Sequence, residues 1–299
     1  MSDNSTSENV RDGKKYDYVI GSIYIVEQLV SLLFNLAAVY VLSPSLKPLQ
    51  NEKKSFGKLN GIFLLTLFAA HAVSCINGLP AMAVYIYNGT RINPYTRSSL
   101  VMNEFIFIVE VLTTITLSID RYLAIKKPFM YQNLTEKHAY LTISVILFLG
   151  VLHTIPAFLF ETTYVAISSL IIIGCIAICI CNYRLFAEVK QQCKQISTTI
   201  VHRDHETELQ MKSKINMRLL KSLKMCLVFV LTFLMLWMPF LVIVVLTKKK
   251  IMNNLIYKMM QLIAILNGIF DPLTFFVFRR KARKMILKLL CWFRKKSKR

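Results

Sequence analysis

The sequence predicts an all-α membrane protein, a bundle of seven transmembrane helices followed by a short amphipathic eighth helix. Of the 299 residues, 55% are hydrophobic and only 18% are charged, so polar side chains cannot cover a soluble domain of this size. Apolar segments long enough to cross a bilayer, about 20 residues each, recur along the chain. Lysine and arginine are concentrated in some of the stretches that connect these apolar segments. Together these observations exclude a soluble enzyme.

Seven apolar segments, separated by polar or charged stretches, are the expected spans. They cover residues 20–42, 59–86, 101–125, 139–160, 165–186, 223–246 and 255–278. Residues 1–17 lack the apolar core of a signal peptide, so we expect the first span to insert uncleaved. The expected organisation is an extracellular tail, the bundle, a surface helix and a cytoplasmic tail over residues 1–17, 18–278, 279–293 and 294–299.

The distribution of lysine and arginine predicts the orientation. With the N-terminus outside, 28 of the 37 basic residues lie in the inner loops and tail, as the positive-inside rule requires. The excess of positive charge therefore indicates a membrane protein and not a nucleic-acid partner. In this topology Asn4 and Asn88 are candidate glycosylation sites, whereas the sequon at Asn133 lies inside. We expect a multi-pass protein of the plasma membrane.

The segment after the seventh span is the candidate surface helix. It places Met285, Ile286, Leu289, Leu290 and Phe293 on one face, opposite lysines and arginines. Cys291 near its end is a candidate palmitoylation site, with an unmodified apolar cysteine as the alternative. The seven cysteines form no zinc-type spacing with each other or with histidine, so we expect neither a metal nor a cofactor.

Three motifs lie at matching ends of three spans. The third span ends in Asp120-Arg121-Tyr122, the sixth carries Phe233 with Trp237 and Pro239, and the seventh carries Asn267 with Asp271-Pro272 and Phe275. This order resembles the DRY, F…WxP and (N/D)PxxY motifs of the rhodopsin-like (class A) G-protein-coupled receptors. Asn35 and Pro80 fit that family's markers in the first two helices.

The resemblance implies an activation switch. In the family, the arginine at the position of Arg121 pairs with its neighbouring acid at rest and swings out to admit a heterotrimeric G protein. Trp237 would be the rotamer toggle and Pro239 the kink about which helix six opens. Without the family, Arg121 reads as an interfacial side chain and the Trp-x-Pro as a kinked packing site.

A buried polar cluster departs from the family pattern. Relatives hold a sodium ion between a helix-two aspartate and a helix-three serine, and those positions are His71 and Glu110 here. Asn267 and Asp271 complete the cluster. We expect an ion pair or hydrogen bond between His71 and Glu110, with protonated His71 replacing sodium, because ionisable groups seldom stay unpaired inside a membrane. A neutral histidine bonded to a backbone carbonyl is the alternative.

Two phenols of the family are also missing. The inner end of helix five has Asn182 and that of helix seven has Phe275, where relatives have tyrosines. Neighbouring Tyr183 is a candidate substitute for the first.

The expected ligand site lies near the outer end of the bundle. Asn103 stands where amine receptors carry an aspartate, and Ile265 stands where opsins carry the retinal lysine. A mostly apolar pocket favours a lipid or a peptide over a monoamine. Its candidate residues are Asn103, Glu104, Trp237, Phe240 and Gln261. A very short second outer loop without a disulfide resembles the melanocortin, lipid and adenosine receptor branch.

The expected partners are an extracellular ligand, a heterotrimeric G protein and anionic lipids. Arrestin is a weaker expectation, because the tail after Phe293 holds only Ser297 as a phosphosite. The competing interpretation is a protein of the same fold that has lost ligand-driven coupling and acts constitutively, as a scavenger or as a partner subunit. A transporter is disfavoured, since no internal repeat is visible.

Overall fold

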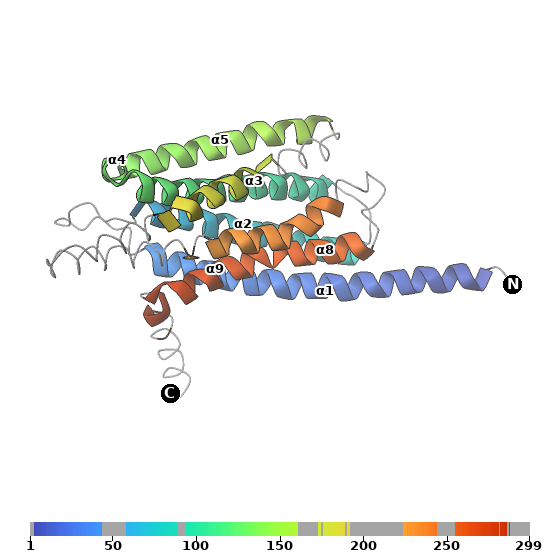
Figure 1. The fold of residues 1–299 in the computed structure, drawn as a ribbon. Coiled ribbons are helices and arrows are strands. Elements are labelled where there is room, and N and C mark those ends of the chain that lie inside the picture. The colour runs from blue at the N-terminus through green and yellow to red at the C-terminus, as the bar shows by residue number, and fades with distance from the viewer. Residues whose placement is uncertain are drawn as a thin grey trace.

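The computed structural model is a helical bundle whose long helices run side by side in alternating directions (Figure 1). It describes residues 3–43, 58–88, 94–160, 173–191, 224–243 and 255–287, except residues 175, 189, 226, 281 and 286. The helices are α1 (Asp3–Leu42), α2 (Lys58–Asn88), α3 (Pro94–Lys126), α4 (Pro128–Gln132), α5 (Glu136–Phe160), α8 (Leu255–Ile265) and α9 (Asn267–Phe278). Further helical segments lie within residues 173–191 and 224–243.

Five helices of the described part are long and apolar enough to cross a membrane. These spans are Tyr18–Leu42, Lys58–Val84, Val101–Lys126, Glu136–Ile155 and Lys258–Phe278, with a shorter apolar helix at Leu227–Ile243. Each coincides with an expected span. The fifth expected span, 165–186, is described only from residue 173 onward.

The first helix is longer than its span. α1 has 40 residues, which at about 1.5 Å per residue is roughly twice the hydrocarbon thickness of a bilayer. The expected N-terminal tail is therefore helical from Asp3, and α1 extends beyond the other helices (Figure 1). Only the apolar part from Tyr18 onward meets the requirements of a span.

α2 holds the centre of the bundle and packs against α1, α3, α5 and α9. At one edge, α5 exposes apolar side chains such as Leu141 and Phe148 over most of its length. An outward apolar face of this kind is suited to contact with lipid acyl chains.

The seventh expected span is one continuous span, Lys258–Phe278, which consists of α8 and α9 joined at Leu266. Within α9, Pro272 has no N–H, so the carbonyl of Gly268 loses its helical donor. Nδ2 of the buried Asn35 donates to that carbonyl at 2.7 Å. It also donates to the Ser31 carbonyl, at 2.8 Å. The proline thus creates the acceptor by which α1 holds α9.

Residues 279–287 continue from α9 at the end of the bundle that carries Arg121. They are helical over most of their described positions. Ala282 is buried there, and Met285 packs on the apolar cluster formed by α1, α2 and α9. Met285 thus lies against the bundle, whereas Leu289, Leu290 and Phe293 lie outside the described residues.

Gly268 permits the close approach of α1 and α9, which a substitution pair can test. A Cβ added at Gly268 would lie 2.5 Å from Ser31 Oγ but 3.6 Å from Ser31 Cβ. Gly268→Ala should therefore lower the unfolding temperature of the purified protein, with an overpacking cost of about 1–3 kcal/mol. Adding Ser31→Ala should recover most of the loss. If the double variant instead shows the sum of the two separate changes in unfolding temperature, this packing is contradicted.

Candidate functional site

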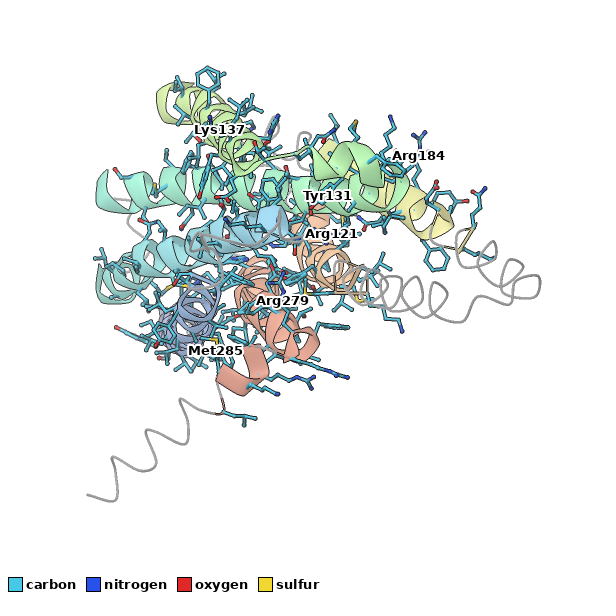
Figure 2. All side chains as sticks on the ribbon, turned by 90° about the vertical axis from the view of Figure 1, so that its left-hand side faces the viewer. Arg121, Tyr131, Lys137, Arg184, Arg279 and Met285 are labelled. Carbon is cyan, nitrogen blue, oxygen red and sulfur yellow. The ribbon has the colours of Figure 1, made fainter. Side chains whose placement is uncertain are left out.

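Asp120 and Arg121 form a buried ion pair at one end of α3, called here the Arg121 end of the bundle. Arg121 Nε donates to Asp120 Oδ2 at 2.9 Å, and Nη2 contacts the same oxygen. The other carboxylate oxygen accepts a hydrogen bond of 2.8 Å from the Tyr131 hydroxyl. Asp120 is thus held by a cation and a phenol together, and Figure 2 shows Arg121 and Tyr131 close together at this end.

Tyr131 comes from α4, a five-residue helix that the sequence analysis missed. Pro128 begins it, as prolines commonly begin helices. One turn later Tyr131 is 3% exposed, beside Asp120. Its burial and the negative charge of Asp120 raise the pKa of the Tyr131 phenol, so it stays a hydrogen-bond donor at neutral pH. The neighbouring Phe129 points away from the bundle and is 84% exposed.

A second arginine lies near this ion pair. Arg279, directly after α9, donates from Nη2 to Asn60 Oδ1 of α2 at 2.9 Å. Its guanidinium stacks over the ring of the buried Phe275 at 5.3 Å. Burial, together with the charge of Arg121, lowers the pKa of Arg279 to about 10, so it remains charged at pH 7. The contact joins the segment directly after α9 to α2, beside Phe275.

The four residues of the expected polar cluster lie together in the middle of the bundle. His71 Nδ1 is 2.8 Å from Glu110 Oε1, and His71 Nε2 is 3.1 Å from Asp271 Oδ2. Asn267 Nδ2 donates to the same Asp271 oxygen at 3.2 Å. The alternative of a histidine bonded to a backbone carbonyl does not hold, because both ring nitrogens face carboxylates.

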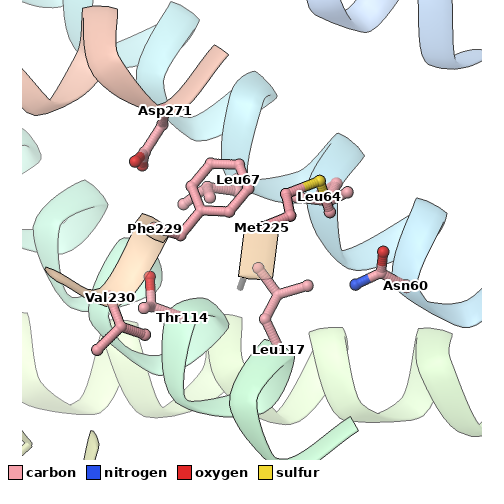
Figure 3. Close-up of a pocket in the computed structure, with 9 residues that line it drawn as sticks. All are labelled: Asn60, Leu64, Leu67, Thr114, Leu117, Met225, Phe229, Val230 and Asp271. Carbon is pink, nitrogen blue, oxygen red and sulfur yellow. The ribbon is translucent and has the colours of Figure 1, made fainter. Parts of the chain in front are cut away.

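A narrow cavity separates this cluster from the Arg121 end (Figure 3). Its space for a water-sized sphere is about 10 Å³, close to the minimum for one water molecule. Asp271 lines one part of it and Asn60 another, and the remaining lining is almost entirely apolar: Leu64, Leu67, Thr114, Leu117, Met225, Phe229 and Val230. A thin apolar layer thus lies between two polar sites.

Trp237 belongs to an aromatic cluster between α3 and the helix at residues 227–243. Its ring lies 4.0 Å from that of Phe107, 6.2 Å from Phe233 and 5.9 Å from Phe240, between ring centroids. The indole Nε1 is buried without a hydrogen-bond partner among the described residues. Pro239 lies in the same helix and is exposed. Among the described residues, the tryptophan is therefore held by apolar packing and not by a hydrogen bond.

Of the expected ligand residues, Asn103 is already engaged within the bundle. Its Oδ1 accepts a hydrogen bond of 2.9 Å from Asn77 Nδ2 of α2. Glu104 and Gln261 are half-buried, and Oε2 of Glu104 is buried without a partner among the described residues. A ligand at Asn103 would have to share or displace the Asn77 contact, which the sequence analysis did not foresee.

At the missing phenol of helix five, Asn182 and not Tyr183 makes the inward contact. Asn182 Nδ2 donates to Ser118 Oγ of α3 at 3.1 Å. Tyr183 is 75% exposed, so the expected substitution by Tyr183 was wrong. Tyr122 is half-buried beside Lys126, whose Nζ lies 5.3 Å from its ring centroid. The expected modification sites, the side chains of Asn4 and Asn88 and the whole of Cys291, lie outside the described part.

Comparison with known proteins supports the seven-helix fold class. Residues 49–168 match the family described as 7 transmembrane receptor (rhodopsin family). The crystal structure of squid rhodopsin superposes with a TM-score of 0.77 at 16% sequence identity, covering 94% of this chain and 87% of that one. No curated protein matches the sequence. The family signature thus covers part of the chain and the fold covers nearly all of it, which confirms the predicted fold class.

The Arg279–Asn60 contact can be measured by a double-mutant cycle on thermal unfolding. Arg279→Ala and Asn60→Ala should each destabilise the purified protein, since hydrogen bonds to charged groups contribute about 1.5–3 kcal/mol. The double variant should lose less than the sum of the two, with a coupling of about 0.5–3 kcal/mol. Arg283→Ala is the control, because Arg283 is exposed one turn further along. Full additivity would show that the two side chains do not interact.

Proposed function

We propose that this seven-transmembrane protein of the rhodopsin family is a plasma-membrane receptor that converts binding of an extracellular ligand into activation of a heterotrimeric G protein. The single observation that carries this proposal is the Asp120–Arg121 ion pair, closed at one end of the bundle by Tyr131. Such a pair can release its arginine when the helices move apart. In the proposed topology this end faces the cytosol, because most basic residues lie at the ends and loops on this side.

The ligand site of the proposal lies at the opposite end. Trp237, Phe240 and Gln261 are half-buried there, so the site is largely apolar. The ligand we favour is therefore a lipid or a peptide segment and not a monoamine. The weaker likeness to the melanocortin, lipid and adenosine receptor branch is compatible with such a ligand and stays a prediction. In the same topology Asn4 and Asn88 would carry sugar, and Cys291 would carry a palmitoyl chain.

The G protein would dock beside the ion pair. Phe129 on α4 offers a large apolar side chain there, next to the partly exposed Met130. An exposed aromatic side chain outside the spans is a common feature of a protein contact surface. Lys137 and Arg184 lie near the same end (Figure 2) and would attract anionic lipid headgroups. Arrestin would bind weakly, for want of phosphosites in the tail.

The proposed switch predicts the effect of removing one hydroxyl. Tyr131→Phe deletes the hydrogen bond to Asp120 but keeps the ring, so Arg121 should be released more often and basal second-messenger signalling should rise severalfold. Arg121→Ala should abolish that signal. Tyr183→Phe is the matched control, since it removes an exposed phenol. Equal signals for the parent and all three variants would favour the alternative, a protein of this fold without ligand-driven coupling.

The proposed docking surface predicts that a substitution on α4 reduces G-protein activation without reducing the stability of the protein. Phe129→Ala should reduce G-protein activation by at least about tenfold, the effect of one interface anchor contributing roughly 1.4 kcal/mol or more. Surface expression and unfolding temperature should stay unchanged, because the side chain packs on nothing in the described structure. Phe148→Ala, at an exposed position of α5, should leave activation unaltered. Retained activation by Phe129→Ala would remove α4 from the proposed surface.

A further inference from the structure

We propose that the imidazolium of His71 is a resident cation of the bundle, which joins two buried carboxylates and takes the place that a metal ion would otherwise fill. The proposal deepens the proposed function, because it concerns how the resting arrangement of the helices is held. It does not require that the protein signals, since it can be tested on the stability of the purified chain.

The three groups come from three helices and meet out of contact with solvent. His71 of α2, Glu110 of α3 and Asp271 of α9 are each at most 4% exposed. The imidazole lies between the two carboxylates, with one nitrogen 2.8 Å from Glu110 and the other 3.1 Å from Asp271. Each distance is that of a hydrogen bond. The ring therefore acts as a bridge and not as the partner of a single acid.

Counting protons shows why the bridge supplies positive charge. An imidazole nitrogen and a carboxylate oxygen both carry lone pairs, so each contact needs one proton between the two atoms. Two contacts need two protons, which on the ring make an imidazolium between two carboxylates. If one proton moves to an acid, the three groups together keep the same single net negative charge. One of the two negative charges is thus compensated from within the chain.

No other charged side chain of the described structure contacts the cluster. The remaining polar contact to Asp271 is from Asn267, a neutral amide. From α1, Asn35 bonds Ser31 and the Gly268 carbonyl and contributes no charge. On α2 the nearest titratable group is the thiol of the buried Cys75. Without His71, two carboxylates would lie together in an apolar interior, an arrangement that needs either a shared proton or a bound cation.

The close packing around the ring leaves little room for an additional ion. Gly268 lets α9 approach so closely that even a Cβ there would lie 3.7 Å from His71 Nδ1. The adjoining cavity has space for about one water molecule. Oδ1 of Asp271 is buried and has no partner among the described residues, so a water there would meet an acceptor. We expect that space to hold water and not a metal ion.

The test compares thermal unfolding of the full-length protein in sodium chloride and in N-methyl-D-glucamine chloride at matched ionic strength. The parent protein should unfold at the same temperature in both. The double variant His71→Asp with Glu110→Ser keeps two acids but lacks the internal cation. It should unfold at a temperature several degrees higher in sodium, because a ligand that binds only the folded state stabilises it. His71→Gln should show the same gain if it folds.

His153→Gln is the control, since it removes a half-buried histidine of α5 far from the cluster and should leave the protein insensitive to sodium. Specific stabilisation of the parent by sodium would overturn the proposal. Insensitivity of both the parent and the folded double variant would overturn it as well, because His71 would then replace no cation. A sodium-insensitive parent with a sodium-responsive double variant would uphold it even if no variant activated a G protein.

Discussion

Charge buried in an apolar bundle has to be neutralised by a partner, and that requirement fixes how the helices of this protein lie against one another. His71 meets the requirement for α2, α3 and α9 at once, because its two nitrogens face Glu110 and Asp271. Pro272, the residue after Asp271, frees the Gly268 carbonyl that Asn35 binds, which adds α1 to the same core. Four helices are thus registered by side chains that have few alternative partners.

The core and the Arg121 end form two polar layers with an apolar layer between them. Asp271 and Asn60 mark the two boundaries, and the leucines between them, with Phe229, keep the layers apart (Figure 3). Met225 and Phe229 belong to the helix that the proposed function expects to move. Displacing them would widen a space that now has room for about one water and would let water reach both layers. Under the proposed function, this apolar layer would have to be disrupted when the helix moves.

Sequence reasoning reached the spans and the polar cluster because both depend on local patterns. Apolar runs define helices without knowledge of their neighbours, and family motifs give the register that pairs His71 with Glu110. The second contact, to Asp271, was not predicted, since it depends on how α9 is rotated. Tyr131 was missed because five-residue α4 has no helical periodicity to detect. Asn60 and Arg279 are 219 positions apart, and no local sequence pattern in either segment predicts their contact.

The departures from the family pattern share a physical logic. At the position where the resemblance to rhodopsin-like receptors would place a tyrosine in helix seven, Phe275 stacks with Arg279, which reaches Asn60 on α2. At the corresponding position of helix five, Asn182 reaches Ser118 on α3. Both are direct contacts between segments far apart in the sequence. Under the proposed function, such contacts would stabilise the resting bundle and would have to break before helix six opens. The proposed switch would then have to break both contacts as well as the Asp120–Arg121 ion pair.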